Sequence, residues 1–425
     1  MGSHGENQMP HLLKNFGRVI FEKSCLSPWP FMAPHVVKLL ILLLASSTLA
    51  AQAPSSWQTF VAGYRQALPQ HAIVGSSVAM VENGAITARE HYGSRDKAAR
   101  LAVDDNTIFH WASITKTFTA IGIVQLRDRG LISLDDPIVK YVPELLKVNN
   151  PFTSKTRTDA ITIRQLLSHS AGFRAGTWPW VESGKPGDQP WQPFEPPSWN
   201  QLVAMMPYTQ VEFAPGTKYS YSNPGYVYLG RVIEEVTEQP FETYIDKEIL
   251  RPLGMTRAFF DQAPSFLRKD KSHSYFVDDK GETEARFDFD TGITVMNGGL
   301  NAPITDMAKY LGLLQGSADA ATQSRYDAII KRASLEDMWK PVVPVSPGVQ
   351  MGLGYFLEEH AGHSFVAHSG GQNGFISHFY VDRATHKAAI IAFNTQTESA
   401  TQGDKRNTRA LDAAMLKLMT ETIFR

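Results

Sequence analysis

Strand-like segments lie at the two ends of this chain, and a largely helical middle separates them. Residues 76–93 read SSVAMVENGAITAREHYG, two apolar runs joined by Asn83-Gly84, which is the strongest short signal for a β-hairpin. Near the other end, three more runs have the strand pattern: SFVAH (364–368), FISHFYV (375–381) and KAAIIAFN (387–394). We therefore predict an α+β fold, in which an antiparallel sheet is built from the N- and C-terminal strands, is flanked by helices, and carries an inserted all-helical region.

The segment before this pattern is typical of a secretory leader. Residues 36–53 read VVKLLILLLASSTLAAQA, with Lys38 first, then a short apolar core, then small residues. The apolar core is too short to span a bilayer comfortably. We expect residues 1–53 to be an N-terminal extension and signal peptide, with Met32 as an alternative start. The mature protein is then expected in the periplasm or medium, without a stable membrane span; an uncleaved N-terminal anchor is the alternative.

Residues 54–425 are expected to form one domain, with its sheet part at about 54–110 and 350–425 and its helical part at about 111–349. The chain has 43% hydrophobic residues, enough for a full core at this length. Lysine plus arginine (41) nearly equal aspartate plus glutamate (42), which disfavours nucleic-acid binding. The single cysteine, Cys25, precedes the expected cleavage point, so the mature chain can form no disulfide.

A serine and a lysine three residues apart stand in the run ASITKTFTA (112–120). Apolar residues follow at spacings of three or four, typical of one face of a helix: Ile114, Phe118, Ile121 and Val124. This pattern predicts a helix over about 112–129, with Gly130 after its end. Ser113 and Lys116 then share a face, where the lysine can reach the hydroxyl and act as a base. The helix N-terminus also offers N–H groups to an oxyanion, so the pair predicts a nucleophile, although such a tetrad also arises by chance.

A second motif lies in YSYSNPGY (219–226), before a helix predicted over 223–238. Asn223 can cap this helix, and Pro224 suits its first position. If the segment is extended, Tyr221 and Asn223 point the same way. A neighbouring lysine cation would lower the pKa of the Tyr221 phenol, which could then accept the serine proton. The alternative is that Asn223 only caps and Tyr221 only packs.

A third motif, AHSGGQNGF (367–375), follows a strand and is rich in glycine. Glycines at the end of a strand permit close approach by a ligand, and a backbone N–H there can complete an oxyanion hole with that of Ser113. An ordinary turn with a surface histidine is the alternative. Separately, residues 178–199 contain four of the eight tryptophans and six prolines, which predicts a packed functional loop rather than a plain connector; a loop that its tryptophans only pin to the helical region is the alternative.

Ser113-Ile-Thr-Lys116, Tyr221-Ser-Asn223 and His368-Ser-Gly-Gly371, in this order, resemble the three active-site motifs of the serine β-lactamase and penicillin-binding superfamily. The resemblance is greatest to the class C-like branch, with its D-alanyl-D-alanine carboxypeptidases and lactamase-like carboxylesterases. Four further segments between and around these motifs, here called the framing text, also match the family: LLSHSAGF (166–173), PLGMT (252–256), NGGLNAP (297–303) and MGLGYF (351–356). The resemblance implies a sheet domain and a helical region with the site between them.

The resemblance also implies the chemistry: a secreted serine hydrolase that forms an acyl-enzyme on an ester or an amide or peptide and needs no cofactor. Ser113 would be the acylated nucleophile, Lys116 its helical partner and Tyr221 the general base. Substrate-binding roles would fall to the remaining motif residues: Asn223, His368, Ser369, Gly370 and Gly371. The N–H groups of Ser113 and Gly371 would form the oxyanion hole. The expected partner is a small-molecule or peptide acyl substrate, and the sequence is silent on oligomeric state.

His368 departs from the β-lactamase pattern, in which a lysine usually stands at this position. Histidine is largely neutral above about pH 6.5, so recognition of acidic substrates should depend on pH. A class C-like β-lactamase, or a penicillin-binding protein with little turnover, is therefore the alternative. A metalloenzyme is disfavoured because the histidines crowded into 360–386 match no H-E-x-x-H pattern, and an α/β-hydrolase is disfavoured because G-x-S-x-G is missing from the sequence.

Overall fold

The computed structural model describes residues 55–148, 158–173, 198–209, 211–260, 262–285, 292–399, 401, 404 and 406–425. All of them belong to one compact unit, Ala53–Arg425. The predicted signal segment lies outside the described residues, as does the tryptophan- and proline-rich stretch up to residue 197. Among the described residues, no helix has the length and apolar character needed to cross a membrane.

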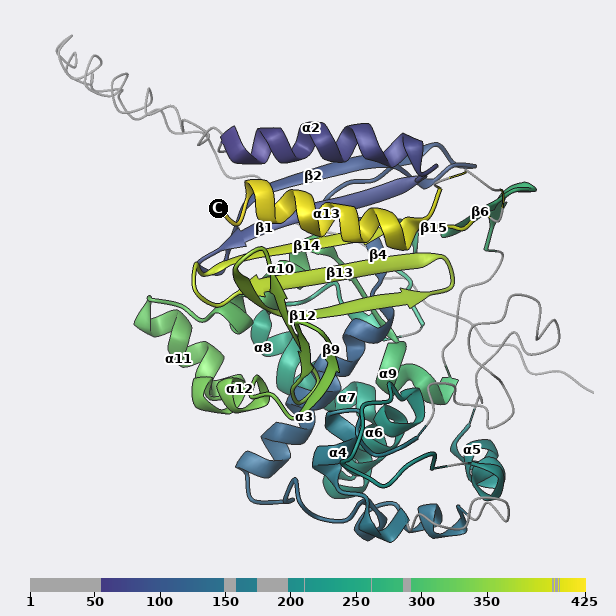
Figure 1. Ribbon diagram of the computed structural model, residues 1–425, viewed down its shortest axis with the longest axis vertical. Helices are drawn as coiled ribbons and strands as arrows, with labels where there is room; N and C mark the ends of the chain where they lie inside the picture. Colours follow the sequence, from purple (N-terminus) through teal and green to yellow (C-terminus); the bar gives the residue numbers. More distant parts are fainter. Residues whose placement is uncertain are drawn as a thin grey trace, which may run out of the picture. The chain divides into compact units, whose positions relative to one another are not determined.

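An antiparallel sheet of nine strands, in the order β3-β2-β1-β14-β13-β12-β11-β10-β9, joins the two ends of the described chain (Figure 1). The N-terminal part supplies β1 (Gly75–Glu82), β2 (Ala85–Asp96) and β3 (Leu101–Ala102). The C-terminal part supplies β9 (Val343–Ser346), β10 (Val349–Met351), β11 (Phe356–His360), β12 (His363–Gln372), β13 (Phe375–Asp382) and β14 (Lys387–Phe393). Because β1 pairs with β14, the strands from both ends meet at the middle of the sheet, which confirms the predicted fold class.

The predicted hairpin forms at its predicted turn. Asn83 and Gly84 both have positive φ, 49° and 75°, as a two-residue turn of the primed type requires. β1 is buried from Gly75 to Val81, which explains its continuous small and apolar sequence, whereas β2 alternates between exposed and half-buried residues. The hairpin therefore places β1 inside the sheet and β2 nearer its edge.

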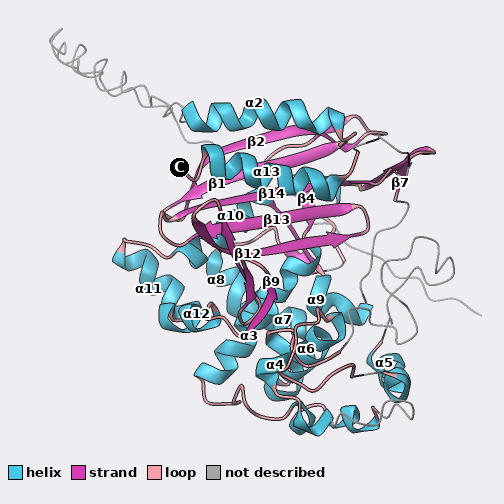
Figure 2. Ribbon diagram, in the orientation of Figure 1, coloured by secondary structure: helices cyan, strands magenta, loops and turns pink. Residues whose placement is uncertain are grey.

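Helices cover both faces of the sheet (Figure 2). α2 (Ser55–Gln70) and α13 (Thr408–Thr422) pack on one face, and α10 (Ile304–Gln315) packs on the other with the helical region. The remaining described α-helices are α3 (Thr115–Asp128), α4 (Ile163–Leu167), α5 (Trp199–Met205), α6 (Asn223–Thr237), α7 (Phe241–Ile245), α8 (Arg251–Leu253), α9 (Val295–Gly298), α11 (Ala320–Ile329) and α12 (Arg332–Met338). Short strands lie among and after these helices: β4 (Ile108–His110), β5 (Phe259–Phe260), β6 (Tyr275–Asp278), β7 (Gly281–Glu284), β8 (Leu300–Pro303) and β15 (Thr395–Thr397).

The helix after Ser113 is more central than its sequence predicts. It begins with a 3-10 turn, η1 (Ala112–Ile114), and α3 is then buried at every residue from Thr115 to Leu126 rather than on one face. Threonine hydroxyls are tolerated there because they donate to backbone carbonyls, as Thr117 does to the Ile114 oxygen at 2.8 Å. α3 is therefore a core helix, which holds the turn at its start firmly in place.

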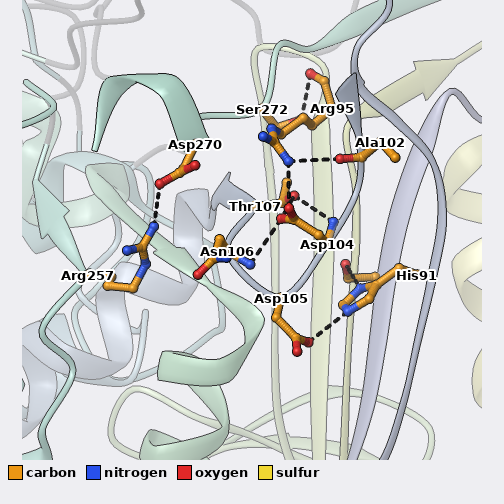
Figure 3. A network of polar contacts seen from close by, with 11 residues as sticks. His91, Arg95, Ala102, Asp104, Asp105, Asn106, Thr107, Arg257, Asp270 and Ser272 are labelled. Carbon is orange, nitrogen blue, oxygen red and sulfur yellow. Dashed lines mark hydrogen bonds and ion pairs between the residues drawn. The ribbon is translucent and has the colours of Figure 1, made fainter. Parts of the chain in front are cut away.

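A polar network fixes the loop that leads from β2 into β4 (Figure 3). The Arg95 guanidinium donates to the Ala102 carbonyl and to Asp104 Oδ2, both at 2.9 Å. Asp104 Oδ1 also accepts from the Thr107 hydroxyl at 2.8 Å, and the Ser272 hydroxyl donates to the Arg95 carbonyl at 3.4 Å. The network thus ties the loop to a segment almost two hundred residues later in the chain.

Candidate active site

Ser113 and Lys116 meet where η1 passes into α3. The Lys116 ammonium Nζ lies 3.1 Å from Ser113 Oγ and 2.9 Å from the Asn297 carbonyl oxygen. Lys116 is fully buried, whereas Ser113 keeps part of its surface exposed. The residue before the serine, Ala112, has a φ of 47°, a conformation that non-glycine residues adopt at a cost and that often marks functional sites. The serine is thus presented to solvent above a buried lysine.

Tyr221 completes this group of three side chains. Its phenol hydrogen-bonds to the Ser113 side chain, and its ring centroid lies 5.0 Å from Lys116 Nζ. Burial raises the pKa of the Tyr221 phenol, and the hydrogen bond to Ser113 opposes this rise only in part. The predicted lowering by the lysine is therefore wrong in direction, because desolvation of the phenolate outweighs nearby positive charge. Tyr221 is a neutral phenol at neutral pH.

The predicted cap of the next helix shifts by one residue. Ser222 rather than Asn223 is the N-cap of α6, and its hydroxyl accepts the Gly225 N–H at 3.1 Å. Asn223 is instead the first helical residue, and its carbonyl oxygen accepts from Asn297 Nδ2 at 3.2 Å. Because the Asn297 carbonyl also accepts from Lys116, Asn297 links two of the three motifs. The sequence offered one signal for this residue, its place in the framing text NGGLNAP.

The third motif lies on β12, where the strand extends beyond its neighbour. Pairing between β11 and β12 ends at Phe356 and Ala367, whereas pairing with β13 continues to Gln372. Gly370 allows the strand to pass close to the serine turn, because a Cβ there would lie 2.2 Å from the Trp111 carbonyl oxygen. The strand edge after Ala367 is thus beside Ser113, as the oxyanion-hole prediction for Gly371 requires; that role stays a prediction.

His368 is buried, so the alternative of a surface histidine is wrong. Its Nδ1 lies 2.7 Å from the Ser369 carbonyl oxygen, to which it donates as the protonated ring nitrogen, and its Nε2 is buried without a partner. Burial, together with the Lys116 cation, lowers the pKa of His368 to about 3. His368 is therefore neutral throughout the physiological range, and the expected loss of its charge near pH 6.5 does not occur.

Ser369 and Gly371 belong to the opposite side of β12. Ser369 pairs across the strands with His378, on the face where Ala367 joins the apolar cluster under α13. Gly371 is exposed, and a Cβ there would lie 2.7 Å from the Arg409 guanidinium. Arg409 also lowers the pKa of Tyr221 slightly through its charge, although burial dominates. This exposed arginine of α13 escaped the sequence analysis because only the fold brings it to the strand edge.

A second buried histidine, His169, lies in the same group. Its Nδ1 accepts the Ser222 N–H at 3.1 Å, and its ring centroid lies 4.4 Å from that of Tyr221. Burial, then Lys116 and His368, lowers the pKa of His169 well below its ordinary value. The framing text LLSHSAGF contained this residue, but its spacing to the other motifs gave no sign of a contact.

The histidines of 360–386 do not converge. His360 contacts Glu358 at 2.8 Å, His363 contacts Asp382 at 2.8 Å, and His378 contacts Asp412 at 2.9 Å. Within the part of the chain that the structure describes, no group of three or more histidine, cysteine, aspartate or glutamate residues is placed to hold a metal ion.

Comparison with known proteins bears on the family and the fold. The profile of the beta-lactamase family matches residues 57–414, most of the chain. An octameric penicillin-binding protein homologue from Pyrococcus abyssi has a similar structure, with a TM-score of 0.69, 27% sequence identity, and coverage of 85% of this chain and 77% of that one. A beta-lactamase/D-alanine carboxypeptidase from Pseudomonas syringae shares the fold, with a TM-score of 0.66, 19% identity, and coverage of 86% and 99%.

Among curated relatives, esterase EstB of Burkholderia gladioli is 30% identical over 207 residues, which are 47% of this chain and 50% of that protein. The chain thus spans about half the length of this relative. For the protein flp of Staphylococcus aureus, the matched share is 35% of its length.

Proposed function

The chain belongs to the beta-lactamase family of hydrolases, and we propose that it is a secreted serine hydrolase that forms an acyl-enzyme on an ester or an amide or peptide. One observation carries the proposal: the Ser113 hydroxyl contacts both a buried lysine and a neutral tyrosine phenol. A serine hydroxyl is a weak nucleophile, and it requires a proton acceptor within hydrogen-bond distance. This group of three side chains provides one.

The proposed reaction has two halves. In acylation, Ser113 Oγ attacks the acyl carbon and passes its proton to the Tyr221 phenol oxygen, while the phenol donates its own proton to the leaving group. The Lys116 ammonium stabilises the negative charge that develops on these oxygens. The products are acyl-serine and the free alcohol or amine. In deacylation, water adds to the acyl carbon and passes a proton to the Tyr221 phenol oxygen, the phenol donates its own proton to Ser113 Oγ, and the carboxylic acid is released. The raised pKa of Tyr221 supports a donor role for the phenol first, rather than that of a phenolate base.

The neutral state of His368 supports esters and amides over β-lactams as substrates. A cation at this position would favour an anionic substrate, and His368 supplies none. The name of one relative, esterase EstB, agrees with this choice. Arg409 favours substrates that carry a carboxylate, because its guanidinium at Gly371 offers a cation to a D-alanyl peptide or, in the alternative reading, to a β-lactam.

A substrate panel separates these candidates. Purified protein should be assayed with short and long acyl nitrophenyl esters, a D-alanyl-D-alanine peptide and a chromogenic cephalosporin, each alongside the Ser113→Ala variant. We expect turnover of the esters or the peptide that vanishes in Ser113→Ala, and slower cephalosporin hydrolysis. Faster turnover of the cephalosporin than of every ester and peptide would favour the β-lactamase alternative. Acylation of Ser113 without release would indicate a penicillin-binding protein.

Secretion is the further part of the proposal, and the order of charge, apolar core and small residues in 36–53 supports it. Protein recovered from the periplasm or medium of an expressing bacterium should begin between Ala51 and Ser55 when its N-terminus is sequenced. Recovery of only full-length protein from the cytosol would contradict export.

A further inference from the structure

We propose that His169 is a positioning residue for the reaction: it fixes the Tyr221 phenol against Ser113 by accepting a hydrogen bond from the backbone on the far side of Tyr221. This inference rests on the proposed acyl-enzyme function, and it adds a residue that none of the three motifs contains.

The contacts of His169 bracket Tyr221 in the chain. The His169 carbonyl oxygen accepts the Ser220 N–H at 2.8 Å, and the imidazole Nδ1 accepts the Ser222 N–H at 3.1 Å. Between these two anchors, the imidazole ring packs on the Tyr221 ring at a centroid distance of 4.4 Å and an angle of 34°. The backbone before Tyr221, the backbone after it and one face of its ring are therefore all in contact with the same residue.

The hydrogen bond to Ser222 also fixes the state of the imidazole. Because Nδ1 accepts a hydrogen bond, it carries no proton, so the ring must be neutral with its proton on Nε2. Burial and the nearby Lys116 cation lower the pKa of His169 and disfavour a second proton, so the acceptor at Nδ1 persists at neutral pH. The protonated nitrogen, Nε2, is buried without a partner, so the Ser222 contact is the hydrogen bond through which the described ring acts on its surroundings.

The backbone at His169 decides which substitutions can test this role. His169 has a φ of 52°, in the left-handed region, where asparagine and glycine are tolerated better than other residues. An asparagine side chain at this position would keep an oxygen acceptor near the place of Nδ1, whereas glycine would keep the backbone and remove the acceptor. His169→Asn and His169→Gly are therefore a matched pair. They differ in whether residue 169 can accept the Ser222 hydrogen bond, and not in backbone strain.

Steady-state kinetics on the best ester of the panel should separate the pair. We expect His169→Gly to lower kcat by about 10- to 100-fold, the range of a lost buried hydrogen bond, with KM changed less than about threefold. His169→Asn should retain kcat within about threefold of the wild type. Near-UV circular dichroism and thermal melting should show folded protein for both; His169→Ala replaces the glycine variant if the latter does not fold.

A double-mutant cycle tests whether the effect passes through Tyr221. If His169 acts by positioning that phenol, the two substitutions should not have independent effects. The kcat of the double variant should then be less than about threefold below that of Tyr221→Phe alone. Two outcomes would overturn the proposal: equal loss of kcat in the asparagine and glycine variants, or independent losses that multiply in the double variant. Failure of the proposed function would look different, because the wild-type protein itself would then show no turnover dependent on Ser113.

Discussion

Two polar clusters of this protein differ in the partners of their cations. In the network of Figure 3, cations meet carboxylates: Arg95 contacts Asp104 at 2.9 Å, and Arg257 contacts Asp270 at 2.6 Å. In the candidate active site, Lys116 contacts neutral oxygens of Ser113 and Asn297 instead. The two buried histidines beside it are neutral, and each has one ring nitrogen without a partner.

The difference separates groups that hold the fold from groups available for chemistry. Paired opposite charges near a surface stabilise one arrangement of the chain and leave little capacity for a further partner. Buried groups that stay neutral beside a lysine, with ring nitrogens unpartnered, reduce stability but can respond to a proton or a substrate. Disrupting the first cluster should therefore reduce stability, and disrupting the second should reduce activity.

The largest effect is expected from the groups that contact Ser113. Lys116→Ala and Tyr221→Phe should each lower kcat by about 10² to 10⁴-fold, the range typical of lost acid–base catalysis. Tyr219→Phe is the matched control, because the Tyr219 phenol is not among the groups that contact Ser113. This variant should have the kcat of the wild type. Steady-state kinetics with thermal melting check the prediction. A low activity explained by a low melting temperature in the first two variants would contradict it.

The next effect concerns the Figure 3 network. Arg95→Ala removes hydrogen bonds to Ala102 and Asp104, and it should lower the free energy of unfolding by about 2–3 kcal/mol with kcat unchanged. Arg65→Ala is the control, because the Arg65 pair with Glu90 is exposed and should contribute less than about 0.5 kcal/mol. Urea denaturation measures both. A fall in the kcat of Arg95→Ala without a loss of stability would contradict the structural role assigned to this network.

Acidification should reduce stability through the site histidines. The pKa of His368 is about 3 in the folded protein, below that of an unfolded histidine, so only the unfolded chain gains a proton between pH 7 and pH 5. The free energy of unfolding should then fall by about 1–2 kcal/mol for this residue over that interval. His368→Gln should show a shallower pH dependence in urea denaturation. An equal slope in wild type and variant would mean that His368 is protonated when folded.

The smallest effect is a change of preference. His368→Lys introduces a cation that the wild-type site lacks, and it should raise the activity ratio of carboxylate-bearing β-lactams to neutral esters by about threefold to tenfold. Competition between the two substrates measures this ratio directly. An unchanged ratio would show that the side chain at this position does not face the substrate.

Local patterns predicted the parts of the molecule that depend on neighbours in sequence. Asn83-Gly84 specified the hairpin turn, and the i, i+3 spacing brought Ser113 to Lys116. Features set by tertiary packing were missed or reversed. The direction of the Tyr221 pKa shift depends on how many atoms surround the phenol, which the sequence does not show. Arg409 reaches the strand edge only because α13 packs across the sheet.

The central claim is that Ser113 carries a covalent acyl intermediate. Intact-protein mass spectrometry after treatment with a fluorophosphonate, and separately with a β-lactam, tests it most directly. The account predicts a single adduct on the wild-type protein, located at Ser113 by peptide mapping, and none on Ser113→Ala. Labelling that persists undiminished in Ser113→Ala would place the nucleophile elsewhere and contradict the account.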